Sequence, residues 1–368
     1  MDKSCQIIVS SIYSGFSKLD DDILSMIFIR LFASIDYTGC YQIISEINKQ
    51  FYRIVLNIIH ILPEINFYST TFKFQKNNGI EKILRETKNI TTLKLKGIIN
   101  DCNLVESIAD YLERNSTLRT LDLSYNMCIK TPTTINIIAQ ALKSNSTLTE
   151  LNLKKTSFYT IDIVEVLKIN TTLTILNLSY TGISFGGEML AETLKINTTL
   201  TTLDLSHTGI WGEMLAEAMK INTTLRTLYV NHNMIDSPGM TAIAEALKYS
   251  KLTTIDISYN NVGHNTAKAI AESLKTNPPL TTFMLNNTRM HSSEIVVIAK
   301  ALKINQTLTT IDISYNDLGN QGTKEIAETI EINTTLTLLN FSYCNMNDDE
   351  VKLIEKALEI NTTINAFF

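Results

Sequence analysis

The residue types that most often carry catalysis or bind metals are few in this chain and lack a catalytic spacing. The sequence contains no GxxxxGK[ST] phosphate loop, no HExxH and no HRD or DFG pair. Its cysteines are scattered and never form a CxxC pair, which argues against a thiolate zinc site. They are Cys5, Cys40, Cys102, Cys128 and Cys344. We therefore predict a protein that is not an enzyme, with no catalytic residues, no metal and no cofactor.

Two weaker candidates for chemistry have structural explanations. The glycine-containing segment "GISFGGE", residues 182–188, lacks the lysine of a phosphate loop and follows a loop pattern that recurs along the chain. His207 and His232 occupy equivalent positions in neighbouring repeats, so we expect them to lie close together. Two imidazoles without further convergent ligands make a poor metal site.

Charge and hydropathy argue against two classes of partner. The chain is 44% hydrophobic with a formal net charge of −5, whereas nucleic-acid binding requires a basic excess. No apolar run approaches the roughly 20 residues that span a bilayer, and the first residues lack the basic region of a signal peptide. We predict a cytoplasmic protein, in the host cytoplasm if it comes from an intracellular pathogen or virus, with no nucleic-acid or membrane partner.

A repeated unit of about 28 residues occupies most of the chain. A typical unit begins with the sequence "LTTLDLSHTGI", residues 200–210. With the first leucine of the pattern LxxLxL as position 1, the units begin at Ile90, Leu118, Leu148, Leu173, Leu200, Leu225, Leu252, Leu280, Leu308, Leu336 and Ile364. A period of this size indicates a solenoid of stacked units.

Within each unit the hydrophobic period changes. Leu203 and Leu205 alternate with polar residues, as in a strand with one buried face. Ile243, Ala246 and Leu247 follow helical spacing. Each unit is therefore predicted to be a strand, a loop, a helix and a turn, and only stacked units can bury its apolar stripe. The predicted fold is an α/β solenoid with parallel strands on the concave side and helices on the convex side.

The units resemble a known repeat family. "LTTIDISYNDLGNQGTKEIAETIEINTT", residues 308–335, is similar to leucine-rich repeats of the ribonuclease-inhibitor type, found also in Ran GTPase-activating proteins and NOD-like receptors. The resemblance covers 90–368, with a degenerate first repeat at 61–89, and implies a horseshoe. It also implies that position 9 holds an Asn or Cys, such as Asn260 and Asn316, whose side chain bonds backbone groups of the following loop, although several units have Thr there instead.

The segment before the repeats, residues 1–60, is predicted to be a small helical domain or a cap. Its "LDDDILSMIFIRL", residues 19–31, and "INKQF", residues 47–51, resemble the F-box, although Asp20 replaces a proline and the connection between them is longer than usual. The resemblance implies binding to a Skp1-like adaptor. The adaptor-binding residues would be Leu19, Ile23, Leu24, Ile27, Phe28, Leu31, Ile47 and Phe51.

A protein target is expected on the concave face, at positions 5 and 8 of the units. These positions are rich in acidic and aromatic residues, which suits protein recognition. The predicted target-binding residues are Asp122, Asp204, Tyr229, Asp256, Met284, Asp312, Tyr125, Tyr180, Tyr259, Tyr315 and Tyr343, together with Trp211. Trp211, with Tyr159 and Phe185 in the two units before it, either forms an aromatic patch or covers a thinned core.

Three functions are compatible with this organisation. The first is the substrate-recognition subunit of a Skp1-cullin-F-box (SCF) ubiquitin ligase. The second is a GTPase regulator resembling Ran GTPase-activating proteins, which an Arg or Asn on a loop edge would favour. The third is a repeat scaffold or sensor without a link to a ligase.

Overall fold

Parallel strands form one continuous sheet along the repeats. The computed structural model describes residues 64–68, 80–81, 84–85, 87–99, 102–126, 132–156, 161–183 and 186–368. Within these residues twelve strands form a single sheet in sequence order. They are β1 (Glu64–Tyr68), β2 (Thr92–Lys96), β3 (Thr120–Asp122), β4 (Glu150–Asn152), β5 (Ile175–Asn177), β6 (Thr202–Asp204), β7 (Thr227–Tyr229), β8 (Thr254–Asp256), β9 (Thr282–Met284), β10 (Thr310–Asp312), β11 (Leu338–Asn340) and β12 (Asn365–Phe367).

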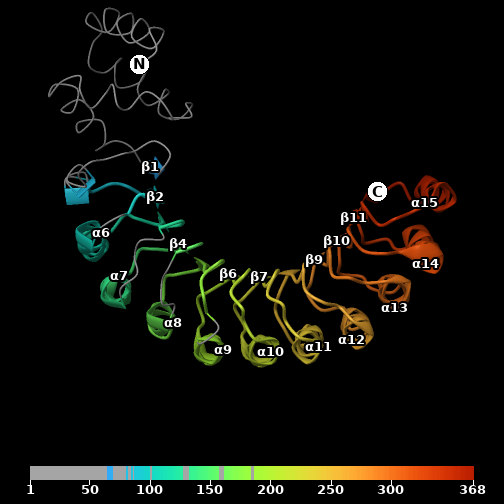
Figure 1. Ribbon diagram of the computed structural model, residues 1–368, viewed down its shortest axis with the longest axis horizontal. Helices are drawn as coiled ribbons and strands as arrows, with labels where there is room; N and C mark the ends of the chain where they lie inside the picture. Colours follow the sequence, from blue (N-terminus) through green and yellow to red (C-terminus); the bar gives the residue numbers. More distant parts are fainter. Residues whose placement is uncertain are drawn as a thin grey trace, which may run out of the picture.

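A helix follows each strand from β2 to β11 and packs against the helices of the neighbouring units. These helices are α6 (Cys102–Arg114), α7 (Pro132–Ser144), α8 (Ile161–Leu167), α9 (Gly187–Ile196), α10 (Gly212–Ile221), α11 (Ser237–Ala246), α12 (His264–Leu274), α13 (Ser292–Leu302), α14 (Gly319–Ile332) and α15 (Asp348–Ile360). Figure 1 shows the strands on the inner side of an arc and the helices on its outer side. Helices are about 10 Å wide and strands lie about 4.8 Å apart, so the stack must curve.

This arrangement confirms the predicted α/β solenoid with a parallel concave sheet and convex helices. The small helical domain predicted for residues 1–60 lies outside the described residues.

Strand pairing aligns equivalent residues of successive units. Asp204 pairs with Tyr229, Tyr229 with Asp256, and Asp256 with Met284, all of them at position 5. β1 joins the sheet with the same offset, because Asn66 pairs with Lys94. Every position of the unit therefore becomes a row that runs across the whole sheet.

The core consists of the apolar residues at positions 1, 4 and 6 together with the inner face of each helix. Leu200, Leu203 and Leu205 have no exposed surface, and the helix residues Leu190 and Leu194 of the same core are at most 1% exposed. Burying a leucine side chain contributes roughly 1.5–3 kcal/mol. Because these positions recur in each unit, the core is continuous from one unit to the next.

Candidate protein-binding surface

Position 5 of each unit forms the central row of the concave face. Its side chains are partly exposed, whereas positions 4 and 6 on either side are buried. The row consists of Lys94, Asp122, Asn152, Asn177, Asp204, Tyr229, Asp256, Met284, Asp312 and Asn340. The structure thus places this part of the predicted surface toward solvent.

Position 8 forms a second row along the rim, where the chain leaves the strand. The described residues of this rim row other than glycine have a left-handed backbone, with φ between 52° and 63°. Such φ values are unfavourable for residues with large side chains. These residues are Tyr125, Lys155, Tyr180, His207, His232, Tyr259, Asn287, Tyr315 and Tyr343.

Four consecutive rings of the rim row are stacked. The ring centroids of Tyr180 and His207 lie 4.0 Å apart, those of His207 and His232 4.1 Å, and those of His232 and Tyr259 3.8 Å. This confirms that the two histidines lie close together. Aromatic pairs of this kind contribute about 0.5–1.5 kcal/mol beyond the burial of their area, which offsets part of the cost of the left-handed backbone. The stack presents a rigid aromatic edge.

The side chain at position 9 bonds to the backbone of the loop that follows the rim row. The Asn260 side chain donates to the carbonyl oxygens of Ile257 in its own unit and Val230 in the preceding one, both at 3.0 Å. Its Oδ1 accepts from the backbone N–H groups of Asn233 and Ile235. This confirms the predicted bonding of position 9 to loop backbone. Thr208 differs, since its hydroxyl donates to the carbonyl of Leu205 in its own unit.

The concave face is electrostatically divided along its length. Across β6 to β11, the third, fifth, seventh and eighth positions contain Asp204, Asp256 and Asp312 and no lysine or arginine. We call these positions the acidic half. At the other end, the same positions of the units at Ile90 and Leu148 contain four lysines, Lys94, Lys96, Lys154 and Lys155, and one acid, Glu150, while the unit between them contains Asp122.

Burial and repulsion act on the titratable groups of the acidic half. Burial raises the pKa of Asp256 most strongly, and the charges of Asp204 and Asp312 raise it further, while hydrogen bonds from Ser258 lower it. Burial also raises the pKa of Tyr229, and the charges of Asp204 and Asp256 raise it further. The carboxylates of the row therefore repel each other.

The basic end differs because its lysines contact rim aromatics of this chain. The ammonium of Lys96 lies 4.6 Å and that of Lys155 5.5 Å from the centroid of the Tyr125 ring. Lys154 lies 5.4 Å from the centroid of the Tyr180 ring. These cation–π contacts occupy aromatic faces that a partner would otherwise contact.

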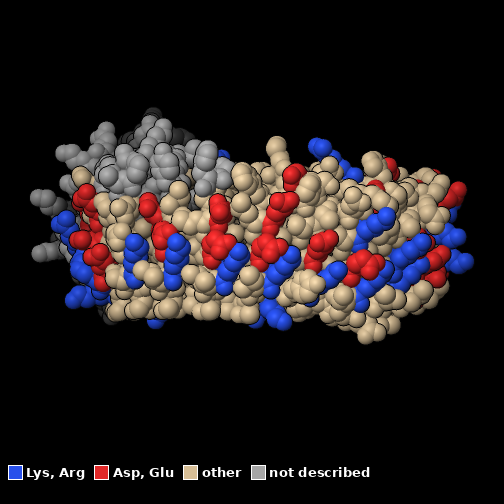
Figure 2. All heavy atoms as spheres, turned by 90° about the horizontal axis from the view of Figure 1, so that it is seen from below, with Lys and Arg blue, Asp and Glu red and all other residues tan. Residues whose placement is uncertain are grey.

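On the convex face, in contrast, acidic and basic side chains are paired with one another. Figure 2 shows acidic and basic groups side by side along the helices. The pairs lie three residues apart, which is the spacing of neighbours on a helix. They include Lys168 with Glu165, Lys195 with Glu192, Lys220 with Glu217, and Lys275 with Glu272.

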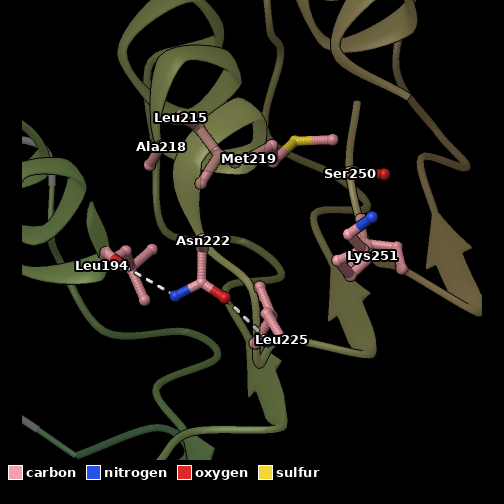
Figure 3. Close-up of a pocket in the computed structure, with 9 residues that line it drawn as sticks. Leu194, Leu215, Ala218, Met219, Asn222, Leu225, Ser250 and Lys251 are labelled. Carbon is pink, nitrogen blue, oxygen red and sulfur yellow. Dashed lines mark hydrogen bonds between the residues drawn. The ribbon is translucent and has the colours of Figure 1, made fainter. Parts of the chain in front are cut away.

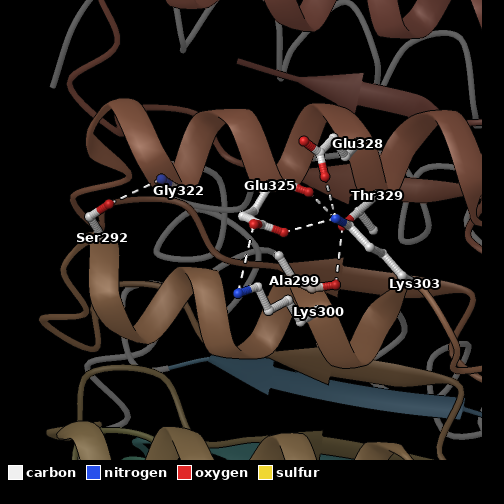
Figure 4. A network of polar contacts seen from close by, with 8 residues as sticks. All are labelled: Ser292, Ala299, Lys300, Lys303, Gly322, Glu325, Glu328 and Thr329. Carbon is white, nitrogen blue, oxygen red and sulfur yellow. Dashed lines mark hydrogen bonds and ion pairs between the residues drawn. The ribbon is translucent and has the colours of Figure 1, made fainter.

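One convex network joins two helices. Lys303 at the end of α13 contacts Glu325 at 2.8 Å and Glu328 at 2.6 Å, both on α14 (Figure 4). Lys300 on α13 also approaches Glu325, at 3.9 Å. These convex charges are thus paired within the solenoid, which makes the concave face the stronger candidate for binding a charged partner.

A second asparagine row was not foreseen from the sequence. Asn222 follows α10, and its Nδ2 donates to the carbonyls of Leu194 and Asn197 in the preceding unit (Figure 3). Its Oδ1 accepts from the N–H groups of Thr224 and Leu225. The same pattern recurs at Asn145, Asn170, Asn197, Asn305, Asn333 and Asn361. The signal in the sequence was an Asn three residues before most of the leucines at position 1.

The second row is interrupted at Ser250, where the turn is one residue shorter than in "INTTL". The Ser250 hydroxyl donates to the carbonyl of Leu247 in its own unit and does not bridge to the preceding unit. A small pocket lies beside this interruption, lined by Leu215, Met219 and Leu252 among others (Figure 3). Its lining is that of the core, so we interpret it as a packing defect.

Trp211 is exposed over 61% of its surface, so it does not cover a thinned core. Tyr159 and Phe185 lie outside the described residues, as do all the predicted adaptor-binding residues from Leu19 to Phe51. Met234, one residue after position 9, was overlooked in the sequence. It is 95% exposed with φ of 52°, and we add it to the candidate surface.

The described part of the chain offers neither a metal-ligand cluster nor a membrane-spanning helix. There, no three His, Cys, Asp or Glu side chains gather as ligands for a metal ion. No described helix is long and apolar enough to cross a membrane. Cys344, at position 9, is buried, and burial raises the pKa of its thiol to about 11, so it is a poor nucleophile.

Comparison with known proteins agrees with the geometry. Seven segments match the family model described as leucine-rich repeat, namely residues 114–129, 170–187, 197–213, 222–244, 250–271, 305–327 and 333–352. No curated protein matches the chain.

Two solved structures share the fold. The leucine-rich repeat-containing protein LegL7 from Legionella pneumophila has 20% identity and a TM-score of 0.50, over 74% of this chain and 88% of that one. The complex of Rad7 and Elc1 in yeast has 15% identity and a TM-score of 0.58, over 99% of this chain and 91% of that one. At these identities the likeness concerns the fold alone.

Proposed function

We propose that this chain, which is a leucine-rich repeat protein, is a non-enzymatic receptor in an SCF-type ubiquitin ligase. Its repeats would hold a protein target on the concave face, and the segment 1–60 would bind a Skp1-like adaptor. Ubiquitin transfer would take place on the partners.

The observation that carries target binding is the stacked rim beside an exposed central row. Tyr180, His207, His232 and Tyr259 are held in a fixed arrangement by their stacking and by the loop below them. Rigid aromatic side chains lose little entropy on binding and are enriched where proteins recognise one another. Since Tyr180 and Tyr259 remain 44% and 41% exposed, the stack is available to a partner.

Support for the adaptor contact comes from the sequence. The motif "LDDDILSMIFIRL" carries the F-box resemblance, with Ile27 and Phe28 in its apolar face. A chain of the yeast complex of Rad7 and Elc1 shares the fold. That complex is a precedent only for a repeat protein of this fold assembling with a second protein.

The test is capture of a purified Skp1 homologue by the full chain. We expect the unchanged chain to bind and the variant Ile27→Asp/Phe28→Asp not to bind, because two unpaired carboxylates in an apolar contact are strongly unfavourable. The matched control is Ile196→Asp/Ile221→Asp, since these isoleucines on α9 and α10 are 61% and 52% exposed. It should bind like the unchanged chain.

Two outcomes would contradict the adaptor contact. In the first, the unchanged chain fails to capture Skp1 homologues at any concentration tested. In the second, the Ile27→Asp/Phe28→Asp variant loses the circular dichroism of the repeats, which would identify these residues as part of a cap on the solenoid.

A GTPase regulator is the second candidate, and Arg289 is the observation that favours it. Arg289 is exposed on the loop between β9 and α13, with φ of 59°, one residue after position 9. A cation on such an edge can reach a bound nucleotide's phosphates. Faster GTP hydrolysis by a Ran-type GTPase, lost in Arg289→Ala, would support this candidate. If both assays fail, the scaffold or sensor remains.

A further inference from the structure

We propose that the acidic half binds a basic α-helical segment of the target, with an arginine on every second turn of the helix. This rests on the proposed function, because it assigns a chemistry to the target of the concave face. Three observations carry it: the sign of the charge, the spacing of the carboxylates, and the aromatic edge beside them.

The sign of the charge selects a cationic partner. Asp204, Asp256 and Asp312 each accept the N–H of the residue two positions later through Oδ1, at 2.9 Å, which fixes the orientation of the carboxylate. No lysine or arginine stands at the third, fifth, seventh or eighth positions of β6 to β11. A cation from a partner would relieve the repulsion within the row.

The spacing selects a helix. The three aspartates stand on alternate strands, β6, β8 and β10, so they recur at about 9.6 Å for strands about 4.8 Å apart. Two turns of an α-helix advance about 10.8 Å. In an extended segment, residues on one face recur at about 6.8 Å and fall out of step. A helix lying across the strands therefore meets one strand with each turn.

The residues between the aspartates fit the intervening turns. Tyr229 on β7 and Met284 on β9 lie at the same position 5 as the aspartates. A helix with arginine at the first and an apolar residue at the fourth position of a heptad presents these two kinds of side chain on successive turns. The acidic and apolar residues that alternate along the central row thus face arginine and apolar residues on successive turns of the partner helix.

The rim favours arginine over lysine. A planar guanidinium can stack flat on an aromatic ring and bind a carboxylate through two parallel bonds, whereas an ammonium acts as a point charge. The exposed rings of Tyr259 and Tyr315 stand beside the row that contains Asp256 and Asp312. The four lysines of the basic end repel the same segment, which limits the proposed contact to β6 through β11.

The experiment measures binding of a labelled peptide to the full chain by fluorescence anisotropy. The peptide has three heptads with Arg at the first position, Leu at the fourth, and Ala or Gln elsewhere. One control peptide carries Glu in place of Arg. A second has the same composition with the arginines consecutive. We expect binding of the first peptide alone, and weaker binding as salt rises, since surface charges are screened.

The decisive variant is Asp204→Asn/Asp256→Asn/Asp312→Asn. Asparagine retains the oxygen that accepts the local N–H, so the turn after each strand should be preserved. We expect affinity for the arginine peptide to fall at least about tenfold, which corresponds to about 1.4 kcal/mol. The matched control is Glu165→Gln/Glu192→Gln/Glu217→Gln, which changes the net charge equally on the convex helices. It should bind within about twofold of the unchanged chain.

The inference is overturned if the peptide does not bind, if the peptide with consecutive arginines binds equally well, or if the aspartate variant keeps full affinity. These outcomes leave the adaptor assay untouched, because capture of Skp1 depends on the segment 1–60. Conversely, peptide binding without Skp1 capture would reject the ligase and keep the proposed chemistry of the concave face.

Discussion

The imidazole rings of His207 and His232 are stacked with their centroids 4.1 Å apart and an interplanar angle of 15°. Burial lowers the pKa of His207 most, and the charges of His232 and Lys154 lower it further against an opposing effect of Asp204. Burial likewise lowers the pKa of His232, opposed by Asp256. Both rings therefore favour the neutral form in the folded chain.

The histidine pair predicts a pH dependence of stability. Because the folded pKa values lie below the ordinary value of about 6.5, the unfolded chain binds more protons as the pH falls through that value. The contribution of the pair is complete above about pH 6.5 and is lost below it. We expect the unfolding free energy to fall between pH 7.5 and 5.5 by less in His207→Tyr/His232→Tyr than in the unchanged chain.

Denaturant unfolding at the two pH values measures this difference. Tyrosine is the matched replacement, because it occupies position 8 in five other units and does not titrate in this range. An equal loss of unfolding free energy in both chains would show that protonation of the two histidines is not linked to folding.

Replacements of Asn260, at position 9, are expected to lower the unfolding free energy by different amounts. Asn260→Ala leaves five backbone groups of two units without their side-chain partner, so we expect the unfolding free energy to fall by roughly 1–3 kcal/mol. Asn260→Thr should lose less, because Thr208 and Thr288 show that threonine keeps the bond to its own unit. The exposed neighbour Asn261 provides the control Asn261→Ala. Equal midpoints for all three in urea would refute a bridging role.

Close contact between two helices predicts that Gly212 does not tolerate a side chain. A Cβ at Gly212 would lie 2.6–2.7 Å from backbone atoms of Gly239 at the start of α11. Alanine is favoured over glycine within a helix by about 1 kcal/mol, but moving backbone typically costs about 1–3 kcal/mol. We therefore expect Gly212→Ala to lower the thermal midpoint.

Gly182→Ala is the control for this prediction, because nothing lies within 4 Å of a Cβ at Gly182. A Gly212→Ala chain that melts at or above the midpoint of the unchanged chain would mean that α10 and α11 can separate without loss.

Trp211 is the only tryptophan in the chain, so its fluorescence reports directly on its own exposure. Since it is 61% exposed, we expect fluorescence emission typical of a hydrated indole and efficient quenching by acrylamide. Trp211→Ala should change the unfolding free energy by no more than about 0.5 kcal/mol. Blue-shifted emission that resists the quencher would instead place the indole in the core.

The sequence alone determined the architecture because the relevant signals are local and repeated. Alternation at Leu203 and Leu205, helical spacing at Ile243 and Leu247, and the near-constant interval between units identify strands, helices and their stacking. Since the repeated pattern aligns equivalent positions, the composition of the central and rim rows could also be predicted, including the proximity of His207 and His232.

Only the tertiary structure determined the conformation of the residues in those rows and their contacts between units. The left-handed backbone at position 8, the stacking of its rings, and the pairing of Lys303 with Glu325 across two helices depend on distances between units. The second asparagine row is of the same kind, because Asn222 bonds to carbonyls of the preceding unit. A sequence records which residues recur, but contacts between units are set by how closely strands and helices stack, and only the folded chain fixes that separation.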